Sequence, residues 1–503
     1  MTTRYVIVGG GTAGWLSALI LQDAVKRQKL DASITVVESS KIPTIGVGEG
    51  TTAVFRQMLK HFGLDEFEFL RESEATIKFG IRHKDWKSVG HHYDGPIDDP
   101  HLVVEPQDGM PQSYIDIFSV AAGRKVSDTH LFGSLLNQNK SPFARKANGA
   151  LVPMSPFHHA YHFDQALAGK WLRKKSKGVA TVDAQVLGVE RNAETGDIEK
   201  LLIDGEPVEG DFFFDCTGFR KSLIGKELGG TWVSYRDQLP VNRAMPFWID
   251  LKEGEEIPPY TLAWAQSSGW LWSIPTQTRY GCGYVYSDAF LNPEQAQAEI
   301  EAVLGHKIEP RNDLRFDVGR QKDAWINNCV ALGLSSSFLE PLEATSIHGT
   351  VVQMLVFTTF HLNPADSGRN AYNIFAARQV DDFRDFINLH YVTARRDTPF
   401  WQHVAENCIG EPAKARLEKW QSKMPDYSDF TPLPGRFAHT EQQLHYPVLD
   451  GLGLLNRGVA QKHMEVMPEL RKKAKAAADS LTAEYRAVAP QALGHREFLR
   501  SLS

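Results

Sequence analysis

A lysine and two glutamates lie where their side chains could carry out chemistry. Lys78 stands between Ile77 and Phe79 in TIKFGIRHKDW, where burial of its ammonium costs desolvation unless the group is used. Glu340 and Glu343 follow in SSSFLEPLEATSIHG, a loop between a predicted strand and a predicted helix. We expect Glu343 in the first turn of that helix, beside unpaired backbone N–H groups.

Each of these groups also has a purely structural interpretation. The stem of Lys78 could lie along apolar surface and place its charge in water. Glu343 could be a carboxylate that caps the helix. The backbone N–H groups of Thr345 and Ser346 could donate hydrogen bonds to a bound anion as readily as to a capping side chain. The local sequence leaves these alternatives open.

The N-terminal segment predicts a dinucleotide site. YVIVGGGTAGW places Gly9, Gly11 and Gly14 in the G-x-G-x-x-G spacing, directly after a predicted strand and at the start of a helix. These glycines allow a tight turn, close approach to a pyrophosphate and close packing of helix on strand. Glu38 ends the next strand, ITVVE, where a carboxylate can bind a ribose hydroxyl.

Further loops favour FAD over a nicotinamide cofactor. Glycine-containing loops at 9–14, 46–50 and 333–346 are widely spaced, as is needed to hold an extended dinucleotide at both ends. DFFFDCTGFR adds a strand end at Asp215 to Gly218. That strand end either returns to the dinucleotide or is an ordinary sheet turn.

The stretch GWLWSIP contains two tryptophans one residue apart. Alternation along a strand places Trp270 and Trp272 on one face and Leu271 on the other. The two indoles could form an apolar slab against a cofactor or the wall of a passage that excludes water. A pair of tryptophans in the core is the structural alternative.

The elements that position these residues alternate at the start of the chain and recur far downstream. Apolar runs predict strands at 4–8, 34–38, 211–215, 280–286 and 328–333, with helices at about 13–28 and 344–361. From about residue 376 onward, helix-forming residues predominate. The pattern predicts an α/β core whose sheet is completed by distant pieces of chain.

Composition narrows the class of protein. The 503 residues carry a formal net charge of −6, which gives no electrostatic footprint for nucleic acid. No apolar run reaches the roughly 18 residues of a membrane span, and MTTRYVIVGGG lacks the layout of a signal peptide. The cysteines are scattered, and we expect buried thiols in a cytoplasmic protein without a metal site: Cys216, Cys282, Cys329 and Cys408.

Taken in order, the motifs resemble those of one family. From the first residues to about 401, the chain contains GGGTAGW, GVGEGT, IKFGI, YHFD, DCTGFR, GWLWSIP, GLSSSFLEPLEATSI and RRDTPFW. Each piece alone is weak evidence, but the ordered set is similar to that of the flavin-dependent tryptophan halogenases. GWLWSIP is the motif that distinguishes this family from others.

The resemblance implies an α/β FAD-binding fold like that of the single-component flavin hydroxylases, with a mostly helical module over the substrate. We expect an FAD-binding module at 1–385, with inserted substrate-facing segments at about 90–150 and 236–325. The helical module is expected at 386–503.

The resemblance also implies a function. A separate reductase supplies reduced FAD, which with oxygen and a halide, bromide or chloride, yields hypohalous acid. That acid halogenates an electron-rich aromatic such as indole or a tryptophan derivative. The alternatives are a flavin monooxygenase that hydroxylates or epoxidises an aromatic substrate, and a flavin-binding protein without turnover. No nucleic acid or membrane partner is expected, and a homodimer stays open.

Roles for individual residues follow from the same resemblance. Lys78 corresponds to the catalytic lysine, which hydrogen-bonds hypohalous acid or becomes its haloamine. Glu343 corresponds to the catalytic glutamate, which helps polarise the oxidant or accepts the ring proton. The backbone amides of Thr345 and Ser346 correspond to the halide site.

The remaining assignments concern the cofactor and a tunnel between the flavin and the substrate. The residues assigned to FAD are Gly9, Gly11, Thr12, Ala13, Gly14, Glu38, Gly48, Val186 and Leu334. Those assigned to the tunnel wall, which keeps organic substrate away from the flavin, are Trp270, Trp272, Ile274 and Pro275.

Two departures from the family pattern leave specificity open. Ala344 replaces the usual serine, whose hydroxyl belongs to the link between the flavin loop and the substrate pocket. Ser346 replaces the usual glycine at the halide site, so the halide preference is not defined. GRFAHTEQQLHYPVLDGLG does not match the segments with which tryptophan-specific members hold the amino acid. A bare indole or a larger indole-bearing molecule therefore fits as well as free tryptophan.

Overall fold

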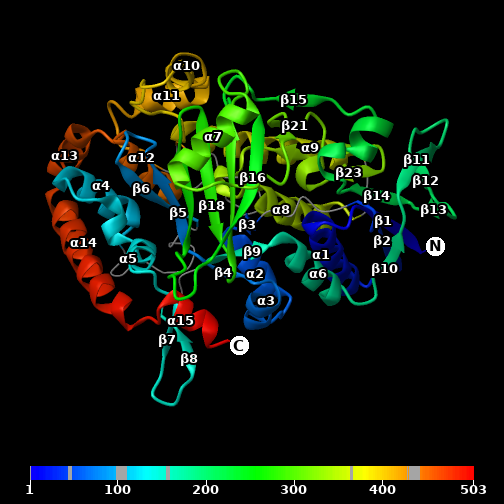
Figure 1. Cartoon of the computed structure of the whole chain (residues 1–503), viewed down its shortest axis with the longest axis horizontal. Coiled ribbons are helices and arrows are strands. Elements are labelled where there is room, and N and C mark those ends of the chain that lie inside the picture. Colours follow the sequence, from blue (N-terminus) through cyan, green and yellow to red (C-terminus); the bar gives the residue numbers. More distant parts are fainter. Residues whose placement is uncertain are drawn as a thin grey trace.

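The computed structural model describes residues 2–42, 48–97, 110–154, 159–362, 366–426, 429 and 442–502. Parts of the predicted segments lie outside the described residues: 46–47 of the loop 46–50, 98–109 of the inserted segment 90–150, and 427–428, 430–441 and 503 of the helical module 386–503, which include the start of GRFAHTEQQLHYPVLDGLG. Two large sheets form the body of the molecule, and helices surround them (Figure 1).

The first sheet has six strands, all parallel except the last, in the order β10-β2-β1-β14-β23-β22. Its apolar strands are buried on both faces, as in other α/β folds, because Ile7 packs under helices and Val6 packs under a small outer sheet. The elements are β1 (Thr3–Val8), β2 (Ala32–Glu38), β10 (Ala180–Asp183), β14 (Phe212–Asp215), β22 (Trp325–Ile326), β23 (Cys329–Ala331), α1 (Thr12–Gln28) and α8 (Thr345–Phe360). The strands and helices predicted for this sheet are confirmed.

The second sheet has seven strands in the order β20-β16-β19-β18-β17-β5-β6. Its neighbours are antiparallel except for β17 and β5. GWLWSIP forms β18, near the middle. The bounds are β5 (Gly80–Lys84), β6 (His92–Pro96), β16 (Arg243–Asp250), β17 (Tyr260–Ala265), β18 (Gly269–Pro275), β19 (Arg279–Tyr286) and β20 (Leu314–Arg315). Helix α7 (Pro293–Leu304) packs on one face through Ile300 and Leu271.

A three-stranded sheet, β3-β9-β4, lies against the second sheet and carries Lys78 at the end of β4. The contact is close: a Cβ on Gly281 of β19 would lie 2.7 Å from the amide nitrogen of Gly48. The bounds here are β3 (Gly48–Gly50), β4 (Thr76–Lys78), β9 (Ala160–Asp164), α2 (Ala53–His61), α3 (Glu66–Glu72) and α6 (Gln165–Lys175).

The C-terminal part is helical, as predicted. Its helices are α9 (Asp366–His390), α10 (Pro399–Asn407), α11 (Glu411–Lys419), α12 (Gln442–Leu452), α13 (Arg457–Glu465), α14 (Pro468–Val488) and α15 (His495–Arg500). Helices α12 to α14 pack on α4 (Gln112–Ala122) through an apolar cluster that includes Phe118, Met464 and Ala474 (Figure 1). The division near residue 385 falls inside α9 and stays a prediction.

One further helix and several short strands complete the fold. They are α5 (Leu131–Asn137), β7 (Phe143–Arg145), β8 (Leu151–Pro153), β11 (Val186–Arg191), β12 (Ile198–Ile203), β13 (Val208–Glu209), β15 (Trp232–Ser234), β21 (Gly319–Gln321) and β24 (Ser337–Phe338). The four cysteines are free and buried, which confirms the expectation of unpaired thiols. None of the described helices has the length and apolar character needed to cross a membrane.

Candidate functional site

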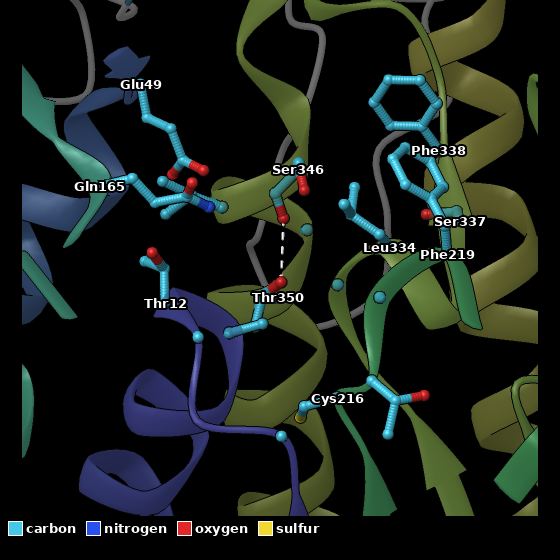
Figure 2. A pocket seen from close by; sticks show the side chains of 18 of the residues that line it. Thr12, Glu49, Gln165, Cys216, Phe219, Leu334, Ser337, Phe338, Ser346 and Thr350 are labelled. Atoms are coloured by element: carbon cyan, nitrogen blue, oxygen red, sulfur yellow. Dashed lines mark hydrogen bonds between the residues drawn. The ribbon is translucent and has the colours of Figure 1, made fainter. Parts of the chain in front are cut away.

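A cavity of about 650 Å³ opens at the carboxyl ends of β1, β2 and β14 and at the N-termini of α1 and α8 (Figure 2). It brings together most of the residues predicted for the site from distant parts of the chain. The predicted residues that line it are Gly9, Gly11, Thr12, Ala13, Glu38, Gly48, Lys78, Val186, Trp272, Ile274, Leu334, Thr345 and Ser346. Gly14, Trp270, Pro275 and Glu343 are not among its lining residues.

The first glycine loop is built by close packing. Gly9 has φ +115°, and a Cβ there would overlap the carbonyl oxygen of Cys216 at the end of β14. A Cβ on Gly14, in the first turn of α1, would overlap the carbonyl oxygen of Gly9. Helix α1 therefore approaches the strand ends as closely as it does only because both positions lack side chains.

The start of α1 has the features of a phosphate site. Gly11 precedes the helix, and within the described chain no side chain caps its first turn. A Cβ on Gly11 would meet no atom within 4 Å, so the space over the helix N-terminus is open. The hydroxyl of Thr12 is buried without a hydrogen-bond partner in the part of the chain that the structure describes. Unpaired donors beside open space fit a pyrophosphate.

Gly14 and Gly11 give a matched pair of variants. We expect Gly14→Ala to lower the free energy of unfolding by about 1–3 kcal/mol, because the methyl group has no room. Gly11→Ala should leave it within about 0.5 kcal/mol, since that space is open, but should weaken FAD binding. Thermal melting without flavin checks the stabilities, and FAD titration checks the affinities. Equal melting temperatures of the two variants, or an undiminished FAD affinity of Gly11→Ala, would contradict the assignment.

Glu38 lies at the end of β2 and is held in place over the glycine loop. Arg173 Nη1 is 2.7 Å from its Oε1, and Trp15 Nε1 donates a hydrogen bond of 3.3 Å to its Oε2. A Cβ on Gly10 would overlap the Glu38 side chain. The carboxylate is thus fixed beside the part of the cavity where the predicted ribose would lie.

The second strand end also belongs to the cavity. Cys216, Thr217 and Gly218 line it, so this strand end is part of the cavity rather than an ordinary sheet turn. Asp215 organises this loop: its carboxylate accepts hydrogen bonds from the backbone N–H of Thr217 (2.9 Å) and from the hydroxyl of Ser335 (3.0 Å).

Lys78 is buried and does not extend to the surface. Its side chain is 1% exposed and lines the cavity beside Gly50. The alternative in which its charge lies in bulk water is wrong, because β4 is enclosed between β9 and the second sheet. Burial lowers the pKa of Lys78 to about 8, against the opposing effect of the negative charge of Glu343.

Glu343 does not lie in the first turn of α8, and the prediction that it does is wrong. It ends a 3₁₀ turn, Pro341–Glu343, and α8 begins only at Thr345. Between them Ala344 has φ +53°, a left-handed conformation that redirects the chain and costs roughly 1–2 kcal/mol without glycine. Glu343 therefore turns away from the helix N-terminus, and it is not a cap.

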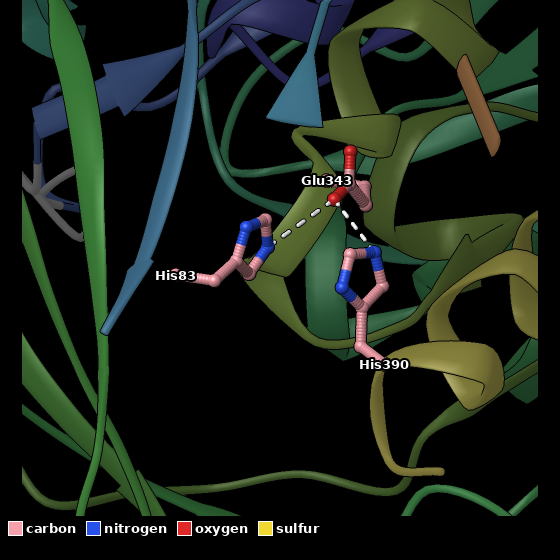
Figure 3. Close-up of side chains that lie close together, drawn as sticks. All are labelled: His83, Glu343 and His390. Carbon is pink, nitrogen blue, oxygen red and sulfur yellow. Dashed lines mark ion pairs between the residues drawn. The ribbon is translucent and has the colours of Figure 1, made fainter. Parts of the chain in front are cut away.

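The Glu343 carboxylate faces two histidines instead (Figure 3). Its Oε1 lies 3.0 Å from Nε2 of His390 and 3.6 Å from Nε2 of His83. Burial alone would raise the pKa of Glu343, but the close contacts with His390 and His83 outweigh it and lower the pKa to about 2. The carboxylate is therefore ionised although it is only 8% exposed.

Thr345 and Ser346 form the rim of the cavity at the start of α8. No described side chain caps this helix, so its first N–H groups remain available. Ser346 is exposed, and its carbonyl oxygen accepts a 2.9 Å hydrogen bond from the hydroxyl of Thr350 (Figure 2). Ser346 thus lines the cavity at the helix start where the resemblance places a halide.

The two tryptophans of β18 have different neighbours. They share one face, as predicted, because Trp270 and Trp272 belong to one core cluster and Leu271 to another. Trp272 lines the cavity with Ile274, and its ring covers Gly283, where a Cβ would overlap it. Trp270 packs against Trp86, with ring centroids 6.2 Å apart. Only part of GWLWSIP thus forms the cavity wall.

The sequence did not indicate four buried groups of this region: Glu49, His83, Glu340 as a cavity residue, and His390. Burial raises the pKa of Glu49 to about 7 and that of Glu340 to about 8, and both line the cavity. Tyr391 donates a 2.8 Å hydrogen bond to Glu340. His83 stands in the same short segment as Lys78, which is a signal for it in the sequence. His390 is the last residue of a long helix, and no motif marks it.

Comparison with known proteins agrees with this architecture. A model of the tryptophan halogenase family matches residues 4–464. The chain is 36% identical over 455 residues to tryptophan 6-halogenase SttH of Streptomyces toxytricini, which covers 85% of this chain and 86% of that protein. It is 32% identical over 487 residues to tryptophan 7-halogenase RebH of Lentzea aerocolonigenes, 90% of each chain.

The fold is shared as well. BrvH, a flavin-dependent halogenase from Brevundimonas sp. BAL3, superposes with a TM-score of 0.85 at 30% identity, over 100% of this chain and 99% of that one. The family model spans most of the sequence, and the mixed α/β fold with its helical C-terminal part is the fold of flavin-dependent halogenases. The chain therefore belongs to the tryptophan halogenase family of flavin-dependent enzymes.

Proposed function

We propose that the protein uses reduced FAD, oxygen and bromide or chloride to halogenate an electron-rich aromatic such as indole or a tryptophan derivative. One observation carries this proposal. Lys78, whose pKa is lowered, is buried in the wall of the cavity, and the negative charge of the ionised Glu343 acts on it. A flavin-binding protein without turnover has no use for such a pair.

The cavity supports FAD rather than a smaller cofactor. The α1 N-terminus with Thr12 fits the pyrophosphate and Glu38 the ribose, while Gly48, Val186 and Leu334 line the cavity farther along. Bound reduced FAD would supply two of the four electrons that reduce oxygen, and the halide would supply the other two, so that one oxygen atom ends as water and the other in hypohalous acid. The N–H groups of Thr345 and Ser346 would hold that halide at the start of α8.

Lys78 and Glu343 would act at different steps of the aromatic halogenation. An N–H of Lys78 hydrogen-bonds the oxygen of hypohalous acid and makes the halogen more electrophilic. The ring carbon forms its bond to halogen, the oxygen–halogen bond breaks, and the oxygen leaves as water with a proton from Lys78. Glu343 stabilises the cationic ring and then accepts the ring proton.

Trp272 and Ile274 would keep the aromatic substrate out of the flavin cavity while a small oxidant passes. Both line the cavity wall, and β18 behind them is held on both sides by β17 and β19. Because β18 is a central strand, this wall is rigid. It favours halogenation over direct oxygenation of an aromatic ring at the flavin.

The substrate is an indole in this proposal, and a separate reductase in the cytoplasm supplies the reduced FAD. SttH and RebH are named for positions of tryptophan, but the sequence here does not match the segments that hold the free amino acid. A panel of free tryptophan, indole and an indole-bearing peptide, each with bromide or chloride, tests this. Conversion of at least one to a halogenated product supports the proposal, and conversion of none refutes it.

The pKa of Lys78 predicts a pH dependence. If its ammonium supplies the proton to the departing oxygen, halogenation should be constant below pH 8 and fall as the pH rises through about 8. The rate of halogenated product formation, measured from pH 6 to 10 with reduced-flavin oxidation in parallel, checks this. A rate that rises through pH 8 would contradict the ammonium donor and favour a haloamine, which forms from the free amine.

A further inference from the structure

Glu343 is not among the cavity-lining residues, and its carboxylate contacts a buried stack of aromatic rings. His83, on β5, lies between Tyr93 of β6 and His390 of α9. Its ring centroid is 4.6 Å from that of Tyr93 and 4.5 Å from that of His390, with interplanar angles of 9° and 21°. Both histidines are 0% exposed. Two stacked imidazoles thus present their Nε2 atoms to one carboxylate oxygen (Figure 3).

The stack leaves the imidazoles little freedom. The indole of Trp86 meets the rings of both histidines edge-on, with centroids 6.0 Å from His83 and 6.2 Å from His390. The hydroxyl of Tyr93 is 2.9 Å from Nδ1 of His390. Contacts within the segment from His83 to Tyr93, and between that segment and the distant helix α9, therefore fix the plane and position of each ring.

The hydrogen bond to Tyr93 links the tautomer of His390 to the direction of that bond. When its hydroxyl donates to Nδ1, the proton of a neutral imidazole must sit on Nε2, the atom that faces Glu343. The opposite tautomer would direct a nitrogen lone pair at a carboxylate. The Nε2–Oε1 contact of 3.0 Å is not aligned as a linear hydrogen bond, and such contacts commonly tighten when substrate binds.

We propose that His83 and His390, with Tyr93 behind them, are positioning residues that hold Glu343 as an ionised base aimed at the aromatic substrate. This inference rests on the proposed function, because it assigns to Glu343 the acceptance of the ring proton. The imidazoles act on the reaction only through that carboxylate.

Glu340 provides a comparison within the same loop. It is as deeply buried as Glu343 but faces Tyr391 rather than an imidazole. Burial raises its pKa to about 8, so it carries a proton at neutral pH. Two glutamates three positions apart are thus held in opposite protonation states, which is the arrangement expected when one of them serves as a base.

The other charged groups around Glu343 do not replace the histidines. Lys78 on β4 acts on it only as a charge, and Tyr93 on β6 contacts it through His390. Asp94 influences His83 but is paired with Arg82, whose Nε lies 2.8 Å away. His390 is the closer of the two imidazoles, so we expect burial to raise the pKa of Glu343 when His390 is removed.

The test compares His390→Phe, which removes the N–H donor, with His390→Gln, which keeps a donor near Nε2. Difference infrared spectroscopy against Glu343→Gln reads the protonation state of Glu343, and product formation from pH 5 to 9 reads its function. His159→Phe is the matched control, since His159 is a buried histidine that pairs with Glu66 elsewhere.

In His390→Phe we expect the C=O band of a protonated Glu343 at neutral pH. Turnover should fall about 10²-fold, with little change in KM, and an acidic limb should appear in the pH profile. His390→Gln should restore most of the turnover, and His159→Phe should show neither the band nor the limb. Should the phenylalanine variant not fold, Tyr93→Phe should lower turnover about 5- to 10-fold and shift the limb in the same direction.

An unchanged infrared band and pH profile in His390→Phe, or equal loss in His390→Gln, would overturn the inference. If the wild-type protein halogenates no aromatic compound, the proposed function fails instead. The infrared measurement still decides whether His390 holds Glu343 ionised.

Discussion

Lys78→Ala is expected to stop halogenation while the protein continues to oxidise reduced FAD. Lys78 lines the cavity, and its N–H is the donor that would engage hypohalous acid. Removing one such preorganised donor from a site without water costs about 10³-fold in turnover. Oxidation of reduced flavin and halide takes place earlier and does not need this amine. Free hypohalous acid, trapped by an added nucleophile, should therefore rise as halogenated product disappears.

A surface lysine separates this effect from a general loss of positive charge. Lys170 on α6 is exposed and does not line the cavity, so Lys170→Ala should halogenate at the wild-type rate. If Lys78→Ala also halogenates at that rate, the assigned role is wrong. If it no longer oxidises reduced flavin, Lys78 contributes to the flavin site instead.

Glu343→Gln is expected to lower the halogenation rate by about 10²- to 10⁴-fold, because glutamine cannot accept the ring proton. The substitution keeps the size of the side chain, so reduced-flavin oxidation and release of hypohalous acid should persist. The rate of halogenated product under saturating substrate measures the loss, and a deuterated ring position shows whether proton removal has become slow.

The neighbouring glutamate is the matched control. Glu340 is protonated at neutral pH, so Glu340→Gln replaces a neutral acid by a neutral amide and should cost at most about 10-fold. Equal losses in the two variants would contradict the assignment of Glu343 as the base. The difference between the halogenation rates of the two variants reports the effect of the negative charge on Glu343.

Sequence patterns predicted the strands and helices of the six-stranded sheet and its glycine loop, because hydrophobic periodicity and glycine spacing determine these elements locally. A continuous apolar strand followed by G-x-G-x-x-G leaves one conformation for the turn, and the structure shows why Gly9 and Gly14 must be glycines. The shared face of Trp270 and Trp272 likewise follows from alternation along a strand.

Other features depend on contacts that no local pattern encodes. The left-handed conformation of Ala344 separates Glu343 from α8, and alanine gives no sign of it in the sequence. Tyr93 and His390 are 297 positions apart, yet they meet beside Glu343. Whether Trp270 or Trp272 faces the cavity depends on which elements cover β18, and only the assembled fold shows that Trp272 does.

One mass spectrum tests the central claim, that a halide-derived oxidant rather than oxygen itself reaches the aromatic ring. Wild-type protein is incubated with reduced FAD, its reductase, bromide, indole and ¹⁸O₂. The proposal predicts a product with the paired bromine isotope pattern and no ¹⁸O, absent when bromide and chloride are both omitted. An indole product that carries ¹⁸O and no halogen, formed equally well without halide, would contradict it.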